Sequence, residues 1–285
     1  MISINNLSFA FKKGKPLFSN LSLDLEPGTI YGLFGLNGAG KTTLLSHMSG
    51  MLFPDSGTCT LNGVPARDRS PKMMSDLFLV PEQFTLPSMT GHEYVQLHAP
   101  FYPGFDMEMM ESSINTFKVD QSSALQELSY GQQKKFLISF ALASNTNVLL
   151  MDEPTNGLDI PSKSQFRKIV ASLDYSDRCI VISTHQVRDL GAMIDQVSII
   201  KNGDIIFNHG LNTIRETLRF TTISQDEDLT YLYGEETLGG MNAICGANQN
   251  QVRSRDSGEL DLELLFNGII TNTEQFQDEF KKVTV

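Results

Sequence analysis

Apolar residues along the first 211 positions follow two alternating patterns. Positions 2–9 and 17–25 alternate apolar and polar side chains, and the second run ends at the turn Pro27-Gly28, so both are predicted to be strands. Short, mostly apolar runs predict buried strands at 30–34, 148–151 and 179–183. Apolar residues at helical spacing predict helices at 42–51, about 108–117, 131–144, 161–173 and 186–193, whereas the Pro-rich stretch 81–106 is expected to be irregular.

A β-hairpin is predicted at 195–200 and 204–207, around the turn Asn202-Gly203. Strands that alternate with helices in this way predict an α/β fold with a largely parallel sheet. The pattern weakens after residue 211, where Gln, Asn, Gly and Asp become frequent, and 211–220 is expected to form a helix or connector. We therefore predict two parts, a main domain at 1–211 and a small C-terminal accessory region at 212–285.

One glycine-rich segment carries a candidate phosphate site. Residues 35–43 fit the pattern G-x-x-x-x-G-K-[ST] between a predicted strand and a predicted helix. Glycines let successive backbone N–H groups turn toward one anion, the helix start adds its positive dipole end, and Lys41 can reach the β- and γ-phosphates. Thr42 is placed to ligate Mg²⁺, and Thr43 to touch an α-phosphate. The expected nucleotide contacts here are Gly35, Asn37, Gly38, Ala39, Gly40, Lys41, Thr42 and Thr43. The alternative is a turn with a chance lysine, which the flanking elements disfavour.

Two carboxylates follow a predicted core strand, at Asp152 and Glu153. The carboxyl end of a parallel strand is where α/β sheets bind ligands. We expect Asp152 to hold Mg²⁺, directly or through water, and Glu153 to orient and deprotonate a water that attacks the γ-phosphate. Taken by itself, such a pair would more often be an exposed turn. Its presence beside a phosphate loop favours the catalytic interpretation.

Composition and charge exclude several classes of protein. Apolar residues make up 40% of the chain and charged residues 19%, as in folded globular proteins. No apolar run approaches the ~20 residues that span a bilayer, and the start of the sequence shows no secretory leader. Cys59, Cys179 and Cys245 are too few and too far apart for a disulfide framework, so a reducing cytoplasm is expected. The net charge of −11 argues against nucleic acid as a partner.

A third motif gives a family resemblance. Leu128-Ser129-Tyr130-Gly131-Gln132 is similar to the LSGGQ signature, and with the two motifs above it resembles the ATP-binding cassette (ABC) family of transporter ATPases over about residues 1–210. The resemblance implies a P-loop cassette with a mixed core sheet, an antiparallel N-terminal β-subdomain and a helical subdomain at about 72–145. It implies that two cassettes enclose two ATP and that Ser129, Gly131 and Gln132 contact the nucleotide held by the partner.

Further residues take roles only through this resemblance. Phe11 lies where the family has a ring that stacks on adenine, and core packing is the equally weighted alternative. Asp159 resembles the carboxylate that crosses to the partner cassette, and His185 the histidine that contacts the γ-phosphate. Residues 79–83 resemble the segment in which a Gln meets Mg²⁺ and the attacking water. Alignment puts Glu82 there in place of Gln83, so both stay candidates.

The resemblance also implies a biological role. We expect an ATPase subunit of a transporter, a homodimer that drives a separate integral membrane permease and lies at the cytoplasmic face of the cell membrane. The closing stretch near 260–266 and the single cassette favour an exporter, since that stretch resembles the end of ABC-2 and drug-exporter ATPase subunits. A groove in 72–127, where several methionines gather, would dock the permease, although those methionines could equally form helix core. The alternatives are a soluble cassette ATPase that powers a non-membrane machine and a regulator that does not hydrolyse ATP.

Overall fold

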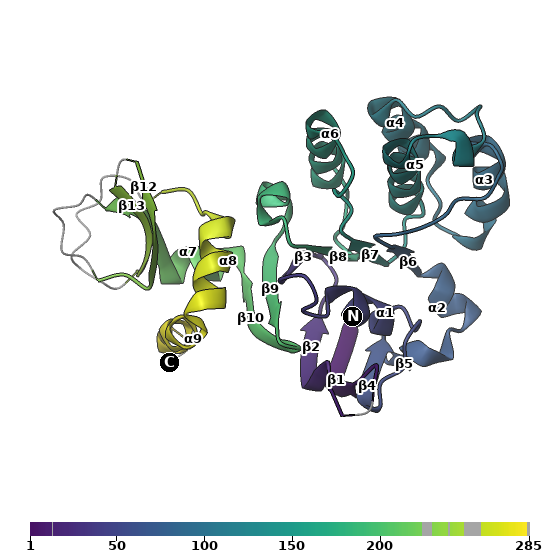
Figure 1. Ribbon diagram of the computed structural model, residues 1–285. Helices are drawn as coiled ribbons and strands as arrows, with labels where there is room; N and C mark the ends of the chain where they lie inside the picture. Colours follow the sequence, from purple (N-terminus) through teal and green to yellow (C-terminus); the bar gives the residue numbers. More distant parts are fainter. Residues whose placement is uncertain (13, 224–229, 239, 248–257, 284–285) are drawn as a thin grey trace.

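The fold is built on three sheets, the largest of which is predominantly parallel (Figure 1). The computed structural model describes residues 1–12, 14–223, 230–238, 240–247 and 258–283. The six-stranded sheet has the order β10-β9-β3-β8-β7-β6. Its strands are β3 (Thr29–Phe34), β6 (Leu77–Val80), β7 (Val148–Asp152), β8 (Cys179–Thr184), β9 (Gln196–Lys201) and β10 (Asp204–Gly210).

The register of this sheet brings the chemistry-bearing strand ends together. β3, β8, β7, β6 and β9 run parallel, and β10 returns antiparallel beside β9. Phe34 pairs with Thr184, and Asp152 pairs with Ser183, so β3, β7 and β8 end at one edge. Both faces of the central strands are covered, which explains their nearly continuous apolar sequence.

An antiparallel sheet of the order β2-β1-β4-β5 forms the N-terminal β-subdomain, as expected. Its strands are β1 (Ile2–Phe9), β2 (Phe18–Leu25), β4 (Ser56–Leu61) and β5 (Val64–Pro65). Apolar side chains of β1 and β2 pack with Leu44, Leu45 and Met48 of helix α1 in one buried cluster. This cluster fixes α1, and therefore the loop before it, against the large sheet.

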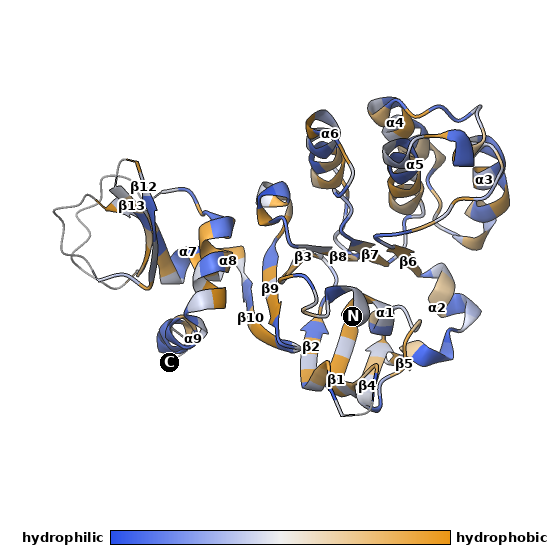
Figure 2. Cartoon of the chain, in the orientation of Figure 1, coloured by the Kyte–Doolittle hydropathy of each residue, from blue (hydrophilic) through white to orange (hydrophobic). Residues whose placement is uncertain are grey.

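The helices pack against the sheets or against one another. They are α1 (Lys41–Met48), α2 (Pro71–Ser75), α3 (Gly91–His98), α4 (Met107–Phe117), α5 (Tyr130–Ala143), α6 (Ile160–Ala171), α7 (Leu211–Thr217), α8 (Leu262–Thr271) and α9 (Thr273–Val283). In Figure 1, α3, α4 and α5 form a separate helical group beyond β6. Figure 2 shows that these helices carry both hydrophobic and hydrophilic residues, as expected of amphipathic helices at a protein surface. None of the helices in the described ranges combines the length and apolar character of a membrane span.

The prediction that 81–106 is irregular is wrong, because α3 lies within it. Thr90 and Glu93 form a capping box: the Thr90 hydroxyl accepts from the Glu93 N–H at 3.2 Å, and the Glu93 carboxylate accepts from the Thr90 N–H at 2.8 Å. This signal for a helix start is present in the sequence. The helix was missed because prolines flank it, Pro87 before α3 and Pro100 and Pro103 after it.

The helix predicted at 186–193 is also wrong, since two short 3-10 turns form instead, at Val187–Asp189 and Gly191–Met193. Val187, Leu190 and Met193 recur at every third residue and are all buried. A repeat of three residues matches the 3-10 turn, and Gly191 with φ +35° interrupts the regular helix.

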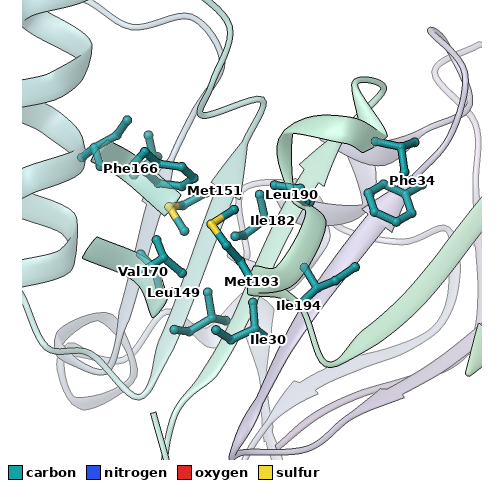
Figure 3. Close-up of a cluster of buried hydrophobic side chains, with 14 of the residues drawn as sticks. Ile30, Phe34, Leu149, Met151, Phe166, Val170, Ile182, Leu190, Met193 and Ile194 are labelled. Carbon is teal, nitrogen blue, oxygen red and sulfur yellow. The ribbon is translucent and has the colours of Figure 1, made fainter. Parts of the chain in front are cut away.

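The central hydrophobic core lies between the large sheet and α6 (Figure 3). Ile30 and Phe34 enter it from β3, Leu149 and Met151 from β7, and Ile182 from β8. Phe166 and Val170 of α6 and the segment 190–194 close it. A large buried apolar cluster here holds the strand ends of the site rigid.

The C-terminal region forms a third sheet with two helices. Its strands are β11 (Leu218–Ile223), β12 (Tyr233–Thr237) and β13 (Gly240–Gly246), in the order β11-β13-β12. The segment 211–220 is helical only to Thr217, and its end belongs to β11. The alternating stretch near 260–266 starts α8, because Asp261 caps the helix by accepting from the N–H groups of Glu263 and Leu264.

Helix α8 packs on the cassette. Phe266 meets Phe34 edge-on, with ring centroids 6.4 Å apart, and both rings belong to the same buried cluster as β3 and β8. Lys201 of β9 donates to the Ile270 carbonyl of α8 at 2.7 Å. The division at residue 211 stays a prediction, and the buried contacts across it predict that the tail contributes to the stability of the cassette.

We expect Phe266→Ala to lower the free energy of unfolding by about 3–5 kcal/mol, as for other buried phenylalanines. Urea unfolding of the full chain measures it. Phe101→Ala is the matched control, since this ring is 66% exposed and its loss should change the free energy by less than about 0.5 kcal/mol. Equal stabilities for the two variants would mean that α8 adds nothing to the core.

Candidate functional site

A cavity of about 600 Å³ opens at the edge where β3, β7 and β8 end. Most of the residues expected to bind nucleotide face it. Its lining consists of Phe11, Leu17, Asn37, Gly38, Ala39, Gly40, Lys41, Thr42, Thr43, Glu82, Glu153 and His185. The structure thus brings together side chains that are up to 174 positions apart in the sequence, counted from Phe11 to His185.

The phosphate loop owes its shape to glycines. Gly40 precedes α1 with φ +110°, a conformation that other residues rarely adopt, and a Cβ there would lie 2.7 Å from the Phe18 ring. A Cβ on Gly35 would lie 2.7 Å from the carbonyl oxygen of Ile200. The loop can therefore press against β2 and β9 only without side chains at these two positions. Within the loop, the Ala39 N–H donates to the Leu36 carbonyl at 3.1 Å.

Lys41 lies folded over this loop. Its side chain is 7% exposed, and Nζ donates to the Gly35 carbonyl at 2.9 Å. The same nitrogen is 3.6 Å from the Glu153 Oε1 atom. The positive charge therefore lies between the loop that would hold the phosphates and the proposed base.

Thr42 lines the cavity, and the buried Asp152, which is not part of the lining, is hydrogen-bonded to it. The Thr42 hydroxyl donates to Asp152 Oδ2 at 2.6 Å, and the Ser183 hydroxyl donates to the other carboxylate oxygen. Hard oxygen donors of this kind fit Mg²⁺, which takes one or two protein ligands and completes its shell with phosphates and water. In the described part of the chain there is no cluster of three or more His, Cys, Asp or Glu that could hold a metal. A site that relies on substrate oxygens is consistent with that.

Glu153 is the most constrained side chain of the site. Oε2 accepts from the Thr184 hydroxyl at 2.8 Å, and Oε1 accepts from the His185 backbone N–H at 3.0 Å. Nδ1 of His185 lies 2.8 Å from Oε1, a distance that requires the proton on Nδ1 if the carboxylate is ionised. Both carboxylate oxygens are thus held, and Glu153 is only 4% exposed. This arrangement can fix the direction in which the base meets a water.

The rim of the cavity settles where three candidates lie. Phe11 is 66% exposed, lines the cavity and touches Phe9 edge-on at 4.9 Å, so its ring is not core packing. Glu82 lines the cavity and accepts a hydrogen bond from Asn156 Nδ2 at 3.3 Å. Gln83 is exposed and is not part of the lining. The geometry therefore favours Glu82 over Gln83 as the residue that meets nucleotide.

The signature residues lie elsewhere. Ser129 caps α5 and accepts from the Gln132 N–H at 3.4 Å, and neither Gly131 nor Gln132 lines the cavity. Asp159 caps α6 by accepting from the Ser162 N–H at 3.0 Å, and the hydrogen bonds from Ser162 lower the pKa of this carboxyl. Within one subunit, these four residues are not brought to the phosphate loop.

Tyr130, which departs from the family signature, has structural partners of its own. Its hydroxyl donates to the Glu82 carbonyl at 2.6 Å, and its ring stacks on Phe84 with centroids 5.4 Å apart. A Cβ on Gly157 would lie 3.1 Å from the same ring. Tyr130 therefore joins the start of α5 to the segment that carries Glu82 without disturbing Ser129 or Gly131.

Sequence reasoning missed Ser183 and Thr184, which hold Asp152 and Glu153 through their hydroxyls. The available signal was a Ser-Thr-His run at the end of an apolar strand. Adjacent parallel strands place residues at matching positions side by side, so this run falls beside the two carboxylates.

Comparison with known proteins identifies a family. A family model described as ABC transporter matches residues 18–156. An ABC transporter ATP-binding protein of Listeria monocytogenes serotype 4b (strain F2365) is 32% identical and aligns over 72% of this chain and 81% of its own length. The ABC transporter ATP-binding protein YtrB of Bacillus subtilis (strain 168) is 27% identical and aligns over 84% of this chain and 82% of its own.

Solved structures show the same fold. The ATP-binding subunit of an ABC transporter superposes with a TM-score of 0.66 at 24% identity, over 75% of this chain and 92% of the other. MJ0796, a bacterial ABC transporter cassette whose structure is dimeric, superposes with a TM-score of 0.65 at 23% identity, over 74% of this chain and 99% of the other. With its phosphate loop, paired carboxylates and signature helix, the chain belongs to the ABC transporter family as an ATP-binding, ATP-hydrolysing subunit.

Proposed function

We propose that two copies of this chain close around two ATP and use hydrolysis to drive a separate membrane permease. The observation that carries the proposal is the Glu153 carboxylate, held on both oxygens by Thr184 and His185 beside Lys41. In this scheme Phe11 stacks on the adenine, the phosphate loop and Lys41 bind the phosphates, and Glu153 takes the proton of the attacking water.

A second subunit supplies what one subunit lacks. Ser129, Gly131, Gln132 and Asp159 do not line the cavity of their own chain. The start of α5 offers unpaired N–H groups and a positive dipole end, which suit a γ-phosphate held by a partner. The dimeric state of the MJ0796 cassette supports the same arrangement here. ATP then bridges the subunits, and hydrolysis removes the bridge.

The donor set also supports magnesium as a cofactor. Thr42 and Asp152 would hold the ion, directly or through water, with Glu82 as a further oxygen donor at the rim. Bound there, Mg²⁺ would neutralise charge that builds on the phosphates during attack. Thr184 and His185 would keep Glu153 aimed at the water throughout.

The helical group offers a surface for the permease. A groove of about 390 Å³ runs between α3 and α4, lined among others by Val95, Met107 and Met110. Met107 is 51% exposed, whereas Met110 is buried, so one methionine is available for contact with a partner and the other belongs to the helix core. We place the permease on this groove and the subunit at the cytoplasmic face of the membrane, in an exporter.

The competing function is a soluble cassette ATPase that powers a non-membrane machine. A methionine import ATP-binding protein that is 31% identical to this chain favours the transporter function over this alternative. Co-purification from detergent-solubilised membranes separates the two functions. A polytopic protein bound in an ATP-dependent manner supports the transporter, and a soluble complex would contradict it.

Lys41→Ala should lower ATP affinity roughly 100-fold, because two charge-assisted phosphate contacts of about 1.5 kcal/mol each are lost. Titration with a fluorescent ATP analogue measures the affinity. Lys72 is an exposed lysine on α2, so Lys72→Ala is the control and should bind ATP as tightly as the unmodified protein does. Unchanged affinity in the Lys41 variant would remove the phosphate-loop assignment.

Glu153→Gln should bind ATP normally, hydrolyse it about 10²–10³-fold more slowly, and accumulate as an ATP-bound dimer, since the amide cannot accept the water's proton. Sedimentation with Mg²⁺ and ATP measures the dimer. Glu108→Gln, at an exposed position on α4, should remain active. A Glu153 variant that stays monomeric at saturating ATP would refute the sandwich arrangement.

Glu82→Ala should slow turnover roughly 10–100-fold, because a side chain that lines the cavity is lost. Gln83→Ala should turn over at the normal rate, since that side chain points away from the lining and is exposed. Steady-state phosphate release measures both. The reverse order would assign the role to Gln83, and two unaffected variants would exclude the whole segment.

A further inference from the structure

Lys134 is a wholly buried lysine without a role in the proposed scheme. It lies in the second turn of α5, five positions after the cap Ser129, and its exposed fraction is 0%. Its Nζ donates to the main-chain carbonyl of Glu153 at 2.7 Å. The hydrogen bond therefore joins the signature helix to the proposed catalytic base within one subunit.

Burial of this ammonium carries a considerable cost. Removing a cation from water costs several kcal/mol unless close partners replace the water. Burial lowers the pKa of Lys134, while the nearby carboxylates of Glu82, Asp152 and Glu153 act in the opposite direction. The Tyr130 ring adds a weaker attraction, with its centroid 5.9 Å from Nζ. An apolar side chain would fill this position at lower cost, so the contact with Glu153 needs another explanation than stability.

The backbone conformation of Glu153 offers an explanation for the buried Lys134. Its φ is +46°, in the left-handed region, where a residue other than glycine costs about 1–3 kcal/mol. Its N–H donates to the Ser183 carbonyl at 3.0 Å, and its own carbonyl accepts from the Asn156 N–H at 3.2 Å as well as from Lys134 Nζ. These three hydrogen bonds hold the peptide groups on both sides of the residue, and the one from Lys134 joins them to α5. The direction of the carboxylate depends on this backbone conformation.

We infer that Lys134 is a positioning residue that holds the Glu153 backbone in its strained conformation and so aims the carboxylate at the attacking water. It does not touch nucleotide itself, since it lies outside the cavity lining. The inference rests on the proposed function, because it gives Glu153 the task described there. In the dimer, the start of α5 faces the ATP of one site while Glu153 serves the other, so Lys134 links the two sites.

The competing explanation is that Lys134 only supports the packing of α5. The two explanations differ in what they predict for ATP-driven dimerisation. A misplaced Glu153 leaves ATP binding and the signature intact, so ATP-bound dimers accumulate as they should for Glu153→Gln. A disturbed α5 weakens the signature, so dimers fail to form.

The test is Lys134→Met in the full chain, which keeps the length of the side chain and removes the donor. We expect kcat for ATP hydrolysis to fall roughly 10–100-fold, as for other misplaced catalytic groups, with KM changed by less than about threefold. Sedimentation with Mg²⁺ and ATP should show a dimer that the unmodified protein does not retain. Lys134→Gln, which keeps a shorter polar donor, should recover part of the lost kcat.

Arg178→Met is the matched control. Arg178 is also a buried cation, and its Nε donates to a main-chain carbonyl, that of Thr146, at 2.9 Å. It directly precedes β8, at the amino ends of the strands and away from the cavity. Its replacement should change stability while leaving kcat and dimerisation as they are.

Normal kcat in Lys134→Met would overturn the inference, and so would a loss of ATP-driven dimerisation in that variant. If Lys134→Met does not fold, Lys134→Gln is judged by the same criteria. Failure of both to fold, with Arg178→Met folded, would show that the lysine serves structure. Absence of ATP hydrolysis in the unmodified protein would instead refute the proposed function.

Discussion

The site depends on one geometric constraint, that β3, β7 and β8 end in register at the same edge of the sheet. This places the phosphate loop, which follows β3, beside the two carboxylates that follow β7 and the Ser-Thr-His run that ends β8. Ser183 and Thr184 reach across one strand spacing to hold Asp152 and Glu153. These strands are buried on one face by the central core and on the other by the cluster that includes α1, so their ends are held between two packed layers.

Charge at this edge is balanced between few groups. Lys41 lies 3.6 Å from Glu153 in the absence of any phosphate contact, and Lys134 approaches the same residue from the opposite side through its carbonyl. A triphosphate that enters the loop competes for Lys41, since several oxygens carry negative charge where Glu153 offers one carboxylate. We expect the base to gain freedom to bind a water as Lys41 turns to phosphate, while His185 and Thr184 keep its direction.

Motifs in the sequence predicted the contiguous parts of the site and the family resemblance suggested His185, whereas Ser183, Thr184 and Lys134 were missed. The loop 35–43 and the pair Asp152-Glu153 are recognisable because their chemistry lies within a few residues. The sequence alone could not decide between Glu82 and Gln83, because they are neighbours on one loop. The structure distinguishes them by their exposure and by whether they line the cavity. Lys134 reads as an ordinary helix lysine, because its partner carbonyl comes 19 residues later in another element. The arrangement of the tail needed the fold for a related reason: its apolar residues pack on cassette residues that lie far away in the sequence.

Two contacts of α5 explain how a signature with Tyr130 can remain functional. The tyrosine ring lies on the side of the Glu82 segment and of Gly157, and Lys134 lies one turn further along, under the Glu153 backbone. The first turns of α5 therefore contact three segments that a nucleotide would also organise. In the proposed dimer, a helix so connected would not shift toward the partner's ATP without some response at its own catalytic edge. Coupling between the two proposed ATP sites would then follow from side chains that join rigid elements.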